Sequence, residues 1–78
     1  MDENRLVKMA NEIGEFFTQM PDREDAVAAI TAHLRNFWEP RMRREIIEYA
    51  LRDGGDLKEI VRTAVLRLEG SQTPAKSP

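Results

Sequence analysis

The sequence has no cysteine and only one histidine, and both features narrow the chemistry that it can perform. Without cysteine there are no disulfides, no thiolate metal ligands and no protein-bound iron–sulfur cluster. His33 has no cysteine partner, and the only serines, Ser71 and Ser77, lie near the C-terminal end, so a nucleophilic triad cannot be assembled. A lone histidine cannot complete the usual metal site, and we interpret His33 as a core or interface residue. The chain is therefore expected to have no catalytic residues and to bind no metal.

Long hydrophobic runs are also missing. No stretch approaches the roughly 18 apolar residues that a membrane span needs. The first residues are acidic and lead directly into an amphipathic pattern, without the basic and apolar regions of a secretory signal. Together with the absence of cysteine, these features predict a cytoplasmic protein with no membrane partner.

The dominant pattern that is present is the apolar periodicity of helices. Apolar residues recur at intervals of three and four, and no segment alternates as a half-buried strand would. The pattern predicts four short helices, at about residues 4–20, 22–38, 40–53 and 56–69. The fold class is therefore predicted to be all-α, a compact bundle of these four helices joined by short connections.

Helix-start and helix-stop signals support these boundaries. Asp22 and Pro40 suit the beginnings of the second and third helices, and Asp56 with Glu59 resembles a capping box for the fourth. Asp53-Gly54-Gly55 is expected to end the third helix through a glycine in the left-handed conformation.

The chain divides into one predicted domain, residues 1–69, and a polar tail, residues 70–78, which is expected to be disordered. A chain of 78 residues buries only roughly 60% of its unfolded surface. We therefore expect a marginal monomer, or one that completes its core against a partner.

The charge is unevenly distributed along the chain. Twelve basic and 14 acidic side chains give a net charge of −2, which disfavours nucleic acid as a partner. Residues 1–32 hold three basic and seven acidic side chains (3 − 7 = −4), whereas residues 33–52 hold five arginines and three glutamates (5 − 3 = +2). A surface that attracts anions should therefore lie in the middle of the chain.

Three arginines, Arg41, Arg43 and Arg44, lie at the start of the third predicted helix. The helix dipole disfavours each exposed cation there by about 0.3–1 kcal/mol. The exposed N–H groups of a helix start, joined by guanidinium groups, would suit a carboxylate or phosphate of another molecule, and the neighbouring aromatic residues are typical interface anchors. Alternatively, Glu39, Glu45 and Glu48 neutralise the arginines within the chain, and both interpretations remain open. The residues predicted to dock onto a partner are His33, Arg35, Phe37, Trp38, Arg41, Arg43 and Arg44.

Three stretches in this order resemble one known family: LVKMANEIGEFF at 6–17, MPDRE at 20–24 and HLRNFWEPRMRR at 33–44. The chain resembles, over roughly residues 5 to 68, the small delta subunit of cytoplasmic NAD-dependent, molybdenum-containing formate dehydrogenase. The resemblance implies an accessory subunit that supports assembly, maturation or stability of a large catalytic subunit, its expected partner. The molybdopterin, iron–sulfur clusters, FMN and NAD of such a complex are expected to be bound by other subunits and not by this chain.

Two other functions remain as alternatives. A transient assembly chaperone would bind only the immature catalytic subunit and would be absent from the mature complex. A small helical nucleic-acid-binding module could use the same arginines, but the acidic net charge and acidic first helix give it poor support.

Overall fold

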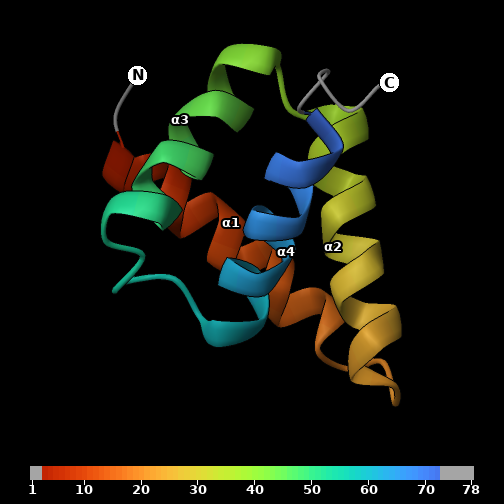
Figure 1. The fold of residues 1–78 in the computed structure, drawn as a ribbon. Helices are drawn as coiled ribbons and strands as arrows, with labels where there is room; N and C mark the ends of the chain where they lie inside the picture. Colours follow the sequence, from red (N-terminus) through yellow and green to blue (C-terminus); the bar gives the residue numbers. More distant parts are fainter. Residues whose placement is uncertain (1–2, 73–78) are drawn as a thin grey trace.

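The computed structural model describes residues 3–72, and within them the fold is all-α (Figure 1). Four helices follow one another along the chain: α1 (Glu3–Phe17), α2 (Arg23–Phe37), α3 (Pro40–Arg52) and α4 (Glu59–Gln72). Helix α4 packs against each of the other three and most extensively against α2, and Figure 1 shows it in the middle of the bundle. The predicted fold class is confirmed.

The ends of α1 and α2 follow from local signals. Helix α1 ends at Phe17, three residues before the predicted boundary, because the residue preceding Pro21 is disfavoured in helical geometry and the chain turns ahead of it. The side chain of Asp22 accepts a hydrogen bond of 2.9 Å from the N–H of Glu24, which confirms it as the N-cap of α2. Trp38 is extended (φ −91°, ψ 145°) and separates α2 from α3.

The predicted left-handed glycine at the end of α3 is also confirmed. Gly54 has φ 69°, and its N–H donates to the carbonyl of Tyr49 at 3.0 Å. Only glycine adopts this conformation without strain from a Cβ, so Gly54 is required where the chain leaves α3.

The predicted capping box of α4 is wrong, because the helix begins at Glu59 and not just after Asp56. The Asp56 N–H donates instead to the Tyr49 hydroxyl at 2.9 Å. Asn11 of α1 supplies the polar contacts near the helix start: its Oδ1 accepts from the Lys58 N–H, and its Nδ2 donates to the Asp56 carbonyl, both at 2.9 Å. A side chain 47 residues away has thus taken the place of the local cap.

The predicted tail boundary is also early, because residues 70–72 continue α4. The expected disorder of residues 73–78 concerns positions that lie outside the described residues, and the division into one domain and a tail stays a prediction.

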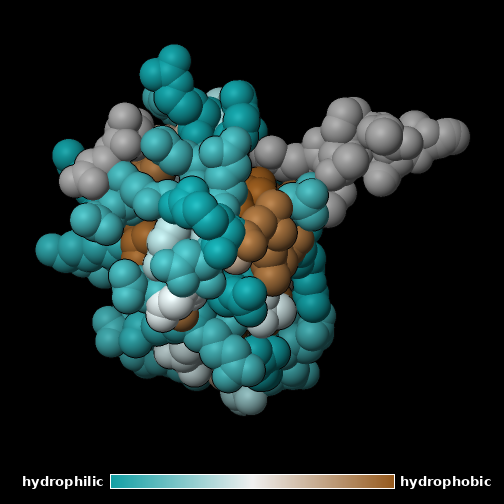
Figure 2. All heavy atoms as spheres, turned by 60° about the vertical axis from the view of Figure 1, so that its left-hand side comes forward, coloured by the Kyte–Doolittle hydropathy of each residue, from teal (hydrophilic) through white to brown (hydrophobic). Residues whose placement is uncertain are grey.

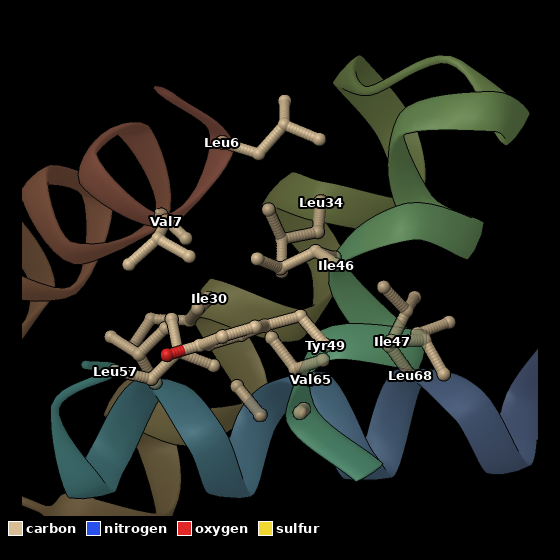
Figure 3. Close-up of a cluster of buried hydrophobic side chains, with 14 of the residues drawn as sticks. Leu6, Val7, Ile30, Leu34, Ile46, Ile47, Tyr49, Leu57, Val65 and Leu68 are labelled. Atoms are coloured by element: carbon tan, nitrogen blue, oxygen red, sulfur yellow. The ribbon is translucent and has the colours of Figure 1, made fainter. Parts of the chain in front are cut away.

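The core lies between all four helices. Figure 3 shows side chains from each helix and from the connection before α4 pointing into one common space. Its largest fully buried members are Leu6, Val27, Ile30, Leu34, Ile46, Val61, Val65 and Leu68. Thr31 is the buried polar residue among them, and its hydroxyl donates to the Val27 carbonyl at 2.8 Å. Among residues 3–69, whose side chains the structure describes, no buried side-chain nitrogen or oxygen lacks a hydrogen-bond partner.

Gly14 is a tight contact between α1 and α4. It is buried, and a Cβ added to it would lie 2.2 Å from Cγ2 of Val61. The absence of a side chain at residue 14 therefore makes room for the Val61 side chain in its present rotamer.

Candidate partner-binding site

Trp38, predicted to anchor a partner, belongs to the core of this chain. Its side chain is only 6% exposed and is part of the buried hydrophobic cluster. The chain is already extended at Trp38, so the direction of its side chain does not follow the helical wheel of α2. The proposal that the indole packs into another protein is therefore wrong.

Arg43 also serves the fold. Its Nη1 donates to the carbonyl of Arg35 at 3.2 Å and to the carbonyl of Trp38, and the side chain is half-buried. Helix C-termini leave their last carbonyls without partners in the helix, and a cation there also suits the helix dipole. Arg43 thus joins the start of α3 to the end of α2, and its guanidinium is not an exposed docking group.

The remaining arginines of the predicted site behave differently. Arg35, Arg41 and Arg44 are exposed, and none of the described carboxylates lies within 4 Å of their guanidinium nitrogens. Arg41 and Arg44 do line a shallow hollow of about 220 Å³ together with Glu45 and Glu48. The alternative of neutralisation within the chain is thus supported in part: the carboxylates are near but form no close ion pair.

Other arginines of the described chain form close ion pairs, unlike Arg41 and Arg44. Glu24 and Arg67 approach to 2.6 Å, and the hydrogen bond from Arg67, followed by its charge, holds the pKa of Glu24 below its ordinary value. Glu3 and Arg52 also lie 2.6 Å apart, and the same two effects raise the pKa of Arg52. Both pairs connect helices distant in sequence, whereas Arg41 and Arg44 connect nothing that the structure describes.

A row of aromatic rings crosses from α1 to α2. Phe16 and Phe17 meet edge to face with ring centroids 5.1 Å apart, Phe17 lies 6.2 Å from His33, and His33 lies 4.9 Å from Phe37. The two ends of the row are exposed, Phe16 by 70% and Phe37 by 73%, whereas Phe17 and His33 are half-buried. His33 therefore lies in an aromatic surface that continues into the interior, which fits the core-or-interface interpretation.

This row borders a groove of about 490 Å³, a size within the range of roughly 300–1,000 Å³ seen for ligand clefts. Its lining is mostly apolar and comes from α1 and from the C-terminal end of α2: Met9, Glu12, Ile13, Phe16, Phe17, His33 and Trp38. The face in Figure 2 is mostly hydrophilic, with one larger apolar patch on its right-hand side and smaller apolar areas elsewhere, and exposed apolar residues are normal on a protein surface.

The contribution of α1 to this site was not predicted, because the apolar periodicity placed Phe16 and Phe17 together on the apolar side of the first helix. Periodicity does not decide which of two adjacent apolar residues is buried: Leu6 and Val7 are both buried, whereas Phe16 is 70% exposed. His33, interpreted as a core or interface residue, is half-buried, and Phe37, a predicted docking residue, is exposed, so contact of either residue with a partner stays a prediction. Trp38 is buried beside them.

The described residues offer no metal site and no membrane span. Within residues 3–72, no three His, Asp or Glu side chains lie close enough to hold a metal ion. No helix in this range is long and apolar enough to cross a membrane.

Comparison with known proteins gives one match. Residues 5–65 match a family model described as the NADH-dependent formate dehydrogenase delta subunit, FdsD, which covers most of the chain. No curated protein and no solved structure matches the chain.

Proposed function

The chain belongs to the NADH-dependent formate dehydrogenase delta subunit family, and from this membership we propose that it is a non-catalytic accessory subunit. In this role it binds the large molybdenum-containing catalytic subunit in the cytoplasm and supports its assembly, maturation or stability. Formate does not contact this chain.

The residue inventory supports the absence of bound cofactors. Iron–sulfur clusters are held mainly by cysteine thiolates, and the chain has none. Its single histidine is packed between Phe17 and Phe37. The molybdopterin, iron–sulfur clusters, FMN and NAD of the complex are in this proposal carried by other subunits.

The observation that carries the proposal is the exposed aromatic surface at the α1–α2 groove. Phe16 and Phe37 each expose more than two thirds of their side chains, although the domain has enough interior to bury other apolar residues completely. Large aromatic residues are enriched in the buried centres of protein interfaces and depleted from free surfaces. His33 borders this surface, and the exposed Arg35, Arg41 and Arg44 remain candidate contacts elsewhere on the chain, whereas Trp38 and Arg43 serve the fold.

The test is expression of the whole complex with and without this chain, followed by purification through the catalytic subunit. Molybdenum content, formate oxidation and the half-life of activity are measured on the same samples. Low metal content without the chain would indicate a role in maturation, and full metal with a short half-life would indicate stabilisation. Unchanged yield, metal content and half-life would refute the proposal.

Native mass measurement of the same complex separates a resident subunit from a transient chaperone. A resident subunit is retained at constant stoichiometry in the active enzyme. A chaperone would be found only with catalytic subunit that lacks its metal.

A further inference from the structure

We infer that the α1–α2 groove receives an apolar segment of the partner protein that carries a lysine or arginine directed at Glu12. This inference rests on the proposed function and adds to it the chemistry of the segment that is bound. It differs from the expectation drawn from the sequence, in which arginines of this chain would meet acidic groups of the partner.

The exposed aromatic rings favour a protein segment as the occupant. Phe16 lines the groove, Phe37 lies 4.9 Å from the lining residue His33 without being part of the lining, and both residues are largely exposed. A small molecule confined to the groove would leave the Phe37 ring in water. A helix or extended segment laid along the groove would cover the groove and both rings together, as in the recognition of amphipathic helices by apolar grooves.

The charge of Glu12 determines what the bound segment must carry. Glu12 is the acidic residue in the groove lining, and its carboxylate is exposed. Lys8, one helical turn earlier, borders a neighbouring hollow with Glu12 and Glu15, but no described cation lies within 4 Å of the Glu12 carboxylate. Covering this carboxylate with an apolar segment removes water from it, which is unfavourable unless the segment supplies a cation or hydrogen-bond donor.

A second copy of this chain is disfavoured as the occupant. The groove lining contains Glu12 and no lysine or arginine, so two copies that met groove to groove would bring two carboxylates together and supply no cation. Two such surfaces would repel each other, whereas a basic apolar segment would be attracted.

A matched pair of charge reversals on α1 tests the inference in the co-expressed complex. Glu12→Lys places a cation in the groove, and Glu15→Lys makes the same change of net charge on an exposed residue outside its lining. Affinity for the catalytic subunit is measured after purification of the variants. We expect Glu12→Lys to weaken binding about tenfold or more and Glu15→Lys to change it by less than about threefold.

A second pair tests the aromatic contacts. Phe16→Ser with Phe37→Ser should abolish retention of the chain, whereas Leu51→Ser, at a side chain 61% exposed on α3, should not. Since all three residues are exposed, thermal unfolding of each variant should match that of the wild type. If the complex assembles and the groove variants are retained as well as the control variant, the inference is overturned.

Photo-crosslinking identifies the occupant. With a photoreactive phenylalanine analogue incorporated in place of Phe37, the crosslinked peptide of the catalytic subunit should be apolar and contain a lysine or arginine. Crosslinks only to a second copy of this chain, or to an acidic segment, would overturn the inference. Failure of the wild-type chain to co-purify would instead refute the proposed function.

Discussion

Replacement of Gly14 by alanine should destabilise the protein, although alanine is the better helix former. In an exposed helix interior, replacing glycine by alanine increases the free energy of unfolding by up to ~1 kcal/mol. At Gly14 the added Cβ would lie 2.2 Å from Cγ2 of Val61, which is fully buried and, as a β-branched residue, is stiff about χ1. Either α1 and α4 must separate or Val61 must leave its rotamer, at the cost of about 1–3 kcal/mol that is typical of overpacking. Because the collision is severe, we expect a net loss of about 1–2 kcal/mol.

Urea denaturation followed by circular dichroism measures this loss directly. For a domain of this size each kcal/mol corresponds to about 4–8 °C, so the melting temperature should fall by roughly 5–15 °C. Val61→Ala provides the control, because it removes the γ-methyl groups and leaves the Cβ of residue 61 at 3.7 Å from the new methyl group, an ordinary contact. In that background Gly14→Ala should be neutral or stabilising, which corresponds to a coupling energy of about 2 kcal/mol between the two positions.

The sign of the change in the free energy of unfolding decides between helix propensity and the steric collision with Val61. If Gly14→Ala raises the free energy of unfolding of the wild type, helix propensity dominates and the close approach of α1 to α4 is refuted. Additive effects of the two substitutions would lead to the same conclusion.

Three further predictions follow from individual contacts. Asn11→Ala removes both hydrogen bonds to the chain before α4 and should cost about 0.5–2 kcal/mol in chemical denaturation; Asn11→Asp, which keeps the acceptor, should lose less. Trp38→Ala should lower the free energy of unfolding by about 3–5 kcal/mol because the indole is buried, whereas Phe37→Ala should change it by less than about 0.5 kcal/mol. Similar melting temperatures of the two variants would contradict the assignment of Trp38 to the core and Phe37 to the surface. The pKa of Glu24 is lowered from 4.5 by the hydrogen bond and charge of Arg67. The stabilisation by this pair is therefore complete above the unfolded pKa and is lost as the pH falls through the folded pKa, so between about pH 5 and 3 the melting temperature of the wild type should fall more than that of Glu24→Gln.

Most of the fold could be predicted from local patterns. The apolar periodicity identified all four helices, and Asp22, Pro40 and Gly54 marked their ends because each acts through its own backbone or nearest neighbours. The start of α4 could not be predicted in this way. Asn11 lies far away in sequence, and its contribution exists only once α1 has docked against the chain before α4.

The candidate site was predicted less well, for a related reason. A helical wheel gives the direction of a side chain only while the helix continues, and it failed at Trp38, where the backbone becomes extended. Arg43 was predicted to dock onto a partner, but the carbonyls that it contacts lie at the C-terminal end of α2 and cannot be located from spacing. Phe16 entered the site only when α1 and α2 came together.

The sequence by itself determined the helices, the family and the absence of cysteine-based chemistry, because each depends on residue types and short spacings. Tertiary packing decided which aromatic residues became core and which remained surface. Trp38 and Phe37 are adjacent and chemically alike, yet one is 6% and the other 73% exposed. The difference arises because burial depends on which side chains of the other helices lie on each side of the backbone, and that arrangement is settled only when the other three helices pack around α4.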